Sequence, residues 1–79
     1  MKHKVINIDP EILNGIPVFY GTRVPIETLF IHLQKGIPLG EFLDDFPTVK
    51  KIQALEILEM AEKMFSSKKV ESLYENIVR

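Results

Sequence analysis

Two adjacent lysines, Lys50 and Lys51, are the side chains whose placement most suggests binding chemistry. They fall in the first turn of a helix predicted to begin near Val49, where the helix dipole disfavours a cation by about 0.3 to 1 kcal/mol. A phosphate backbone, a neighbouring carboxylate such as Asp44 or Asp45, or solvation alone would each explain them. The pair is therefore compatible with nucleic-acid binding but does not require it.

Arg23 is a third cation in a special position, inside a stretch over residues 15–25 that contains two prolines and two glycines. The prolines fix their own φ, and Gly21 allows a positive φ, so the stretch predicts a rigid connection from a strand to a helix. Arg23 then has two interpretations. It ties the connection to backbone carbonyls or to Asp9, or it contacts a phosphate or a partner.

Side chains for catalysis or metal binding are sparse. The chain has no cysteine, and its two histidines, His3 and His32, lie far apart in sequence and make no ligand motif. Asp44 and Asp45 are neighbours, and adjacent helical residues do not face each other. The sequence holds no nucleophile with its base and no phosphate-cradling glycine loop. We therefore expect no enzyme, no cofactor and no metal, and we expect His32 to be satisfied or solvated.

Composition narrows the range of partners. The formal net charge is −1, with +1 over residues 1–35 and −2 over residues 36–79, so no basic tail is available to wrap a nucleic acid. No apolar run approaches the ~20 residues of a membrane span, and no secretory leader opens the chain, which predicts a cytoplasmic protein without membrane contact. Apolar residues make up 46% of only 79 residues. That surplus favours a homodimer or a partner protein.

Hydrophobic periodicity predicts a mostly α fold with a short β-hairpin or β-arm at its start. Alternation and β-branched residues indicate strands at Lys4–Ile8 and Val18–Tyr20. Apolar spacings of three and four predict helices over residues 25–35, 38–46 and 49–65. The first two begin at a proline, Gly36 suits the end of the first, and Thr48 is expected to cap the third. Two short helices, a tight turn and a longer third helix suggest a helix-turn-helix body.

The third helix and the tail contain apolar residues that the predicted body does not account for. Its main stripe comprises Ala54, Ile57, Leu58, Ala61, Met64 and Phe65. Ile52 and Leu55 fall outside this stripe, so the start of the helix must bury a second face. After a break at residues 66–69, an amphipathic spacing returns at Val70, Leu73, Tyr74, Ile77 and Val78. We expect a domain over residues 1–65 and an extension over 66–79 that forms a short helix. The extension is expected to dock in cis, on a second copy, or on another protein. The candidate partner-binding residues are Ile52, Leu55, Val70, Leu73, Tyr74 and Ile77.

The eleven residues from position 15 to position 25 also carry a family resemblance. They read Gly15-Ile16-Pro17-Val18-Phe19-Tyr20-Gly21-Thr22-Arg23-Val24-Pro25. This stretch resembles the Gly-Xaa-Pro-Xaa-Ile-Xaa-Gly-Thr-Arg-Ile-Pro signature of the small prokaryotic family numbered 433 among the domains of unknown function. Agreement continues at Ile8-Asp9-Pro10, Gly36 and Phe46-Pro47, and covers about residues 5 to 64.

The resemblance implies a homeodomain-like, three-helical DNA-binding fold with a β-arm, proposed in this family to serve antitoxins that are encoded beside a nuclease-like toxin. It would make the helix from Val49 a recognition helix. Thr48, Lys50, Lys51 and Gln53 would lie near its amino-terminal end, where such helices meet base edges. Arg23 matches the Gly-Thr-Arg motif. This chain departs at Tyr20, where many relatives have a basic residue, and the loop loses a charge that would hold phosphate.

Two functions follow as expectations. The first is an antitoxin-like, homodimeric DNA-binding regulator that uses Thr48, Lys50, Lys51, Gln53 and Arg23. The second is an interaction module that binds and neutralises a partner toxin without specific DNA binding, through Ile52 and Leu55 and through Val70, Leu73, Tyr74 and Ile77 of the extension.

Overall fold

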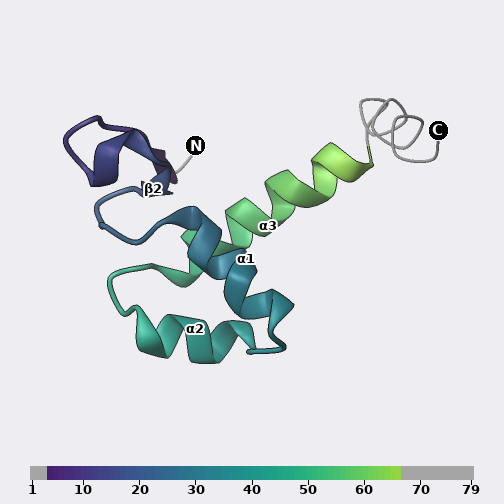
Figure 1. Ribbon diagram of the computed structural model, residues 1–79. Helices are drawn as coiled ribbons and strands as arrows, with labels where there is room; N and C mark the ends of the chain where they lie inside the picture. Colours follow the sequence, from purple (N-terminus) through teal and green to yellow (C-terminus); the bar gives the residue numbers. More distant parts are fainter. Residues whose placement is uncertain (1–3, 67–79) are drawn as a thin grey trace.

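The computed structural model describes residues 4–66 and consists, in that range, of a two-stranded antiparallel sheet followed by three helices (Figure 1). The mostly α fold with an amino-terminal hairpin is therefore confirmed. Residues 67–79, including the expected helix with Val70, Leu73, Tyr74 and Ile77, lie outside the described residues. The elements are β1 (Ile6–Asn7), the 3-10 turn η1 (Leu13–Gly15), β2 (Val18–Phe19), α1 (Ile26–Gln34), α2 (Leu39–Asp45) and α3 (Lys51–Phe65).

The strands are shorter than the sequence predicts. Ile6 pairs with Phe19 and Asn7 with Val18. The expected strand limits of Lys4, Ile8 and Tyr20 are therefore wrong, and the carbonyls of Lys4 and Tyr20 accept hydrogen bonds from the side chain of Gln53. Beyond these pairs, Tyr20 N–H still donates to the Val5 carbonyl at 2.8 Å.

The strand β2 is the centre of the hairpin. On one side it pairs with β1, and on the other it meets the start of α1, with Phe19 N–H donating to the Val24 carbonyl at 2.9 Å. Ile26 N–H donates to the Pro17 carbonyl at 3.0 Å. Gly21, at φ 81°, makes the turn between these two segments. The stretch over residues 15–25 thus doubles back on itself, and its two β2 residues are fully buried.

In α1 and α2, the helix ends lie at the prolines and the glycine that favour such ends. Pro25 and Pro38 are the caps that precede α1 and α2. The end of α1 forms a Schellman motif, in which Gly36, at φ 80°, donates to the Leu33 carbonyl and Ile37 donates to the His32 carbonyl. The expectation that Gly36 ends this helix is confirmed.

The start of α3 differs from the expectation. The helix begins at Lys51 with Lys50 as its cap, so the predicted start at Val49 is two residues early and the predicted cap at Thr48 is wrong. Val49 N–H donates to the Phe46 carbonyl at 3.0 Å, which makes residues 46–49 a turn and leaves Thr48 outside the helix. The cap interaction comes instead from Gln53, whose Oε1 accepts from Lys50 N–H at 2.9 Å.

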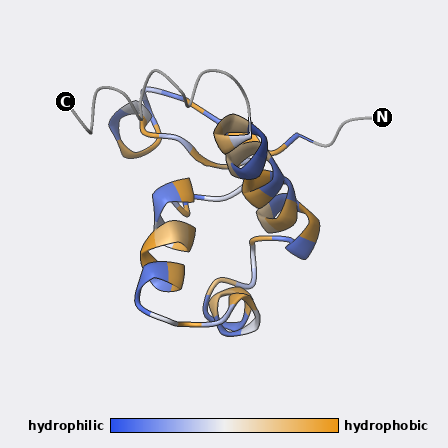
Figure 2. Cartoon of the chain, turned by 90° about the vertical axis from the view of Figure 1, so that its right-hand side faces the viewer, coloured by the Kyte–Doolittle hydropathy of each residue, from blue (hydrophilic) through white to orange (hydrophobic). Residues whose placement is uncertain are grey.

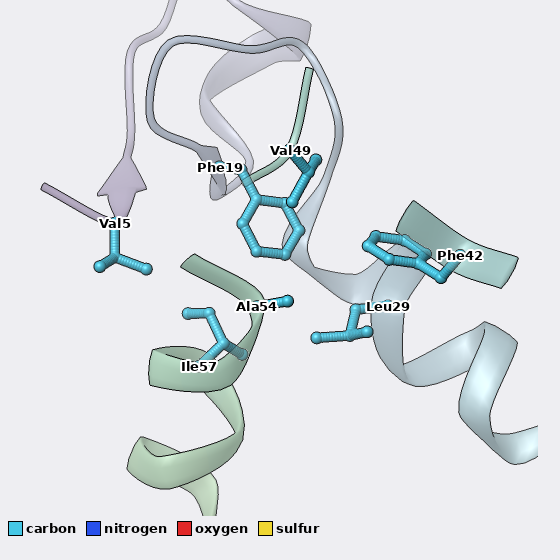
Figure 3. Packing of buried hydrophobic residues seen from close by; sticks show 7 residues of the cluster. All are labelled: Val5, Phe19, Leu29, Phe42, Val49, Ala54 and Ile57. Atoms are coloured by element: carbon cyan, nitrogen blue, oxygen red, sulfur yellow. The ribbon is translucent and has the colours of Figure 1, made fainter. Parts of the chain in front are cut away.

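The core lies where the hairpin, α1, α2 and the first half of α3 meet. Phe19 occupies its middle (Figure 3). The other buried members of the cluster are Val5, Leu29, Phe42, Val49, Ala54 and Ile57. Each helix carries both apolar and polar residues, as Figure 2 shows. The second half of α3 runs away from α1 and α2 (Figure 1), so Phe65, expected on the buried stripe, is 63% exposed.

Candidate nucleic-acid interface

The side chain of Gln53 is the structural centre of the candidate site. It is only 6% exposed, and its amide serves three backbone groups from distant parts of the chain. Oε1 accepts from Lys50 N–H, while Nε2 donates to the Tyr20 carbonyl at 3.0 Å and to the Lys4 carbonyl at 3.5 Å. Gln53 was expected to reach base edges, but its amide is committed inside the protein. It is therefore a positioning residue.

This hydrogen-bonded amide ties the backbone of Lys4 and of Tyr20 to the start of α3, and four cations lie on or next to the connected segments. Lys4 belongs to the arm, Arg23 follows Tyr20 by three residues, and Lys50 and Lys51 start the helix. All four side chains are exposed, and none makes an ion pair with a carboxylate in residues 4–66. Lys4 was missing from the sequence prediction, because only the long-range bond from Gln53 brings its segment here.

The three residues of the Gly-Thr-Arg turn have different roles. Gly21 supplies the positive φ. Thr22 is 9% exposed, and its Oγ1 donates to the Phe19 carbonyl at 2.8 Å and accepts from Val24 N–H at 3.0 Å. Arg23 is exposed and makes no hydrogen bond or ion pair in the described part of the chain. Asp9, its expected partner, instead accepts from Glu11 N–H at 2.9 Å. The interpretation of Arg23 as an internal tie is not supported, and its guanidinium is available to a ligand.

The backbone at the first turn of α3 also favours the binding of an anion. The amides of Lys51 and Ile52 lie at the start of the helix, where no intrahelical acceptor is available. The positive end of the helix dipole lies at the same place. Thr48 is exposed on the preceding turn. An anion near Lys50 therefore meets both side-chain charge and the helix dipole.

Neither Asp44 nor Asp45 makes an ion pair with Lys50 or Lys51 in the described residues. Asp45 Oδ2 lies 3.9 Å from Nε2 of His32, and Nδ1 of the same ring donates to the Thr28 carbonyl at 2.9 Å. The ring also meets Phe42 and Phe46 edge-on. His32 is thus a satisfied histidine in the α1 and α2 packing, as expected.

Residues 4–66 offer few features of a catalytic site, a metal site or a membrane span. An apolar groove of about 250 Å³ lies between the prolines of the signature and α1, lined by Ile16, Pro17, Pro25, Ile26, Glu27 and Phe30. Glu27 is the single titratable side chain in this lining, so the groove has no pair of groups that could act as acid and base. No group of three metal-ligating side chains occurs among residues 4–66, and no helix there is long and apolar enough to cross a membrane.

The expected partner-binding residues of α3 are exposed. Ile52 and Leu55 remain 44% and 45% exposed and lie on the side of the helix away from Ala54 and Ile57. The structure therefore leaves two distinct candidate surfaces on α3. One is the cationic end around Lys50, and the other is the outward side around Leu55.

Comparison with known proteins identifies a family, and the function of that family is unknown. A family model described as "Protein of unknown function (DUF433)" matches residues 6–61. No curated protein and no solved structure matches the chain.

Proposed function

Since the chain belongs to the DUF433 family, whose function is unknown, we propose from its own geometry that it is a DNA-binding regulator that acts as a homodimer. The observation that supports this is the buried amide of Gln53, which ties the segments of Lys4 and Tyr20 to the start of α3 at Lys50, while Lys4, Arg23, Lys50 and Lys51 are exposed and make no ion pair in residues 4–66. Lys4, Arg23 and Lys50 would each neutralise a phosphate and release a counterion. The proposed regulator is antitoxin-like and does not act as an enzyme.

The proposed contacts are mainly to the phosphate backbone. Base readout needs hydrogen-bonding side chains on the surface that enters the groove. The amide of Gln53 is already used, and the outward side of α3 presents Ile52 and Leu55. Thr48, Lys50 and Arg23 suit phosphate oxygens, which position a protein on DNA. The net charge of −1 further requires that affinity come from this local cluster, repeated in a dimer.

Charge reversal in the cluster tests the proposal. Lys50→Glu and Arg23→Glu should each weaken binding to a duplex from the region upstream of the gene by at least roughly tenfold, since each replaces an attraction to phosphate by a repulsion. Fluorescence anisotropy at low salt measures this. Lys35→Glu, at the exposed end of α1, is the matched control and should leave affinity nearly unchanged. Equal loss in all three variants would mean that only total charge matters, and no loss would exclude the cluster.

A second candidate function rests on the exposure of Ile52 and Leu55. The chain would then bind and neutralise a nuclease-like toxin, with Val70, Leu73, Tyr74 and Ile77 of the extension as further contacts. Deletion of residues 67–79 and Leu55→Asp should each abolish co-purification with the product of the adjacent gene. Both variants must still unfold cooperatively. A partner that survives both changes would exclude these surfaces.

A further inference from the structure

The outward side of α3 carries a pattern that its own chain does not use. Lys51, Ile52, Leu55, Glu59 and Glu62 are separated by one, three, four and three residues, which places them on one side of a helix. All five are exposed, and the opposite side supplies the buried contacts to the core. Ile52 and Leu55 therefore form an apolar centre that remains exposed and lies outside the core cluster of residues 4–66.

Charge is distributed unevenly along this side. Lys51 lies at the amino-terminal end of the apolar centre, whereas Glu59 and Glu62 lie at its carboxy-terminal end. Lys51 makes no ion pair in residues 4–66. Glu59 meets Lys63 at 3.3 Å, in an exposed pair one turn along the same helix. Such exposed pairs are weak and are easily rearranged.

This side of α3 is complementary to an inverted copy of itself. A two-fold axis brings the same surface of two subunits together, so the surface must match its own inverted copy. If the axis passes near Leu55, antiparallel α3 helices set Lys51 of one copy against the acidic end of the other. The apolar centres coincide, and the antiparallel helix dipoles oppose each other favourably.

We propose that two copies of this chain associate through this side of α3, antiparallel, with Leu55 near the two-fold axis and Lys51 facing the partner's Glu59 and the partner's Glu62. This interface rests on the homodimer of the proposed function and does not depend on DNA binding. It separates the roles of two adjacent lysines. Lys51 serves self-association, while Lys50, Arg23 and Lys4 remain for phosphate.

A charge-exchange experiment on the full chain tests the interface. The mass by sedimentation equilibrium should be twice the 9.1 kDa of one chain. Lys51→Glu alone and Glu59→Lys with Glu62→Lys should each weaken the dimer by roughly tenfold or more, since each makes two like-charge contacts across the axis. An equimolar mixture of these two variants restores opposite charges at both contacts. Native mass spectrometry should then find the mixed dimer in preference to either homodimer.

Controls separate this proposal from failure to fold and from failure of DNA binding. Lys50→Glu should keep the wild-type mass while losing affinity for DNA, and Leu55→Asp should give a monomer with a cooperative unfolding transition. The interface is excluded if the wild-type chain is monomeric at millimolar concentration, or if it is a dimer whose mass none of the charge changes alters. It is also excluded if the mixture forms no mixed dimer.

Discussion

At the scale of single residues, Gln53 connects three segments that are distant in sequence. Its Nε2 reaches the Lys4 and Tyr20 carbonyls, and its Oε1 holds the amide of Lys50. A buried polar group that loses its partner costs more than the bond itself contributes. Gln53 therefore stabilises the fold and also sets where the cations lie.

Replacement of Gln53 by leucine should lower the free energy of unfolding by about 2 kcal/mol, because it leaves three backbone groups without their partner. Urea denaturation measures the change. Gln34→Leu, at the exposed last residue of α1, is the control and should change stability by less than about 0.5 kcal/mol. Equal stability of the two variants would contradict the role of this amide.

Thr22 offers a second residue-scale test. Its buried hydroxyl both donates to Phe19 and accepts from Val24, so Thr22→Val, which keeps the shape, should cost about 1 to 2 kcal/mol. Thr22→Ser keeps the hydroxyl and should cost less than Thr22→Val. Thermal unfolding of both variants gives the order. A valine variant more stable than the serine variant would show that the methyl group, not the hydroxyl, matters.

At the scale of elements, the caps and turns were the most predictable part of the fold. The prolines before α1 and α2 and Gly36 after α1 act within a few residues, and the structure places them close to where their local chemistry predicts. Thr48 also suited a cap, but the helix begins two residues later because Gln53 provides the capping interaction at Lys50. This capping bond is local, but the bond from the same glutamine to the Lys4 carbonyl spans 49 residues, and no local pattern reveals that contact.

Two glycines should respond to alanine with opposite signs. Gly36 has φ 80° and Gly40 lies inside α2, and a Cβ at either position would meet nothing within 4 Å. Gly36→Ala should therefore destabilise the protein by about 1 to 2 kcal/mol through backbone strain alone. Gly40→Ala should stabilise it by up to about 1 kcal/mol through helix propensity. Urea denaturation measures the change in the free energy of unfolding for both variants. If both substitutions stabilise the protein, or both destabilise it, this account of the two helices is contradicted.

At the scale of the whole molecule, α3 joins three regions with different chemistry. Its start holds the cationic end, its inner side completes the core around Phe19, and its outer side presents Ile52 and Leu55. The sequence placed the last two off the main stripe, on a second face for a partner to bury, and in the structure both are exposed. It grouped Arg23 with Lys50 but did not predict that Lys4 would lie near the start of α3, since that depends on the long-range bond from Gln53.

The salt dependence of DNA affinity tests the central claim, the phosphate-binding role of this cationic end, most directly. In a symmetric dimer Lys50→Ala removes two phosphate contacts, so the slope of log K against log salt concentration should become shallower by about 1.8. Lys35→Ala should leave the slope unchanged. Equal slopes for Lys50→Ala and the wild-type protein, or no binding at low salt, would contradict the claim.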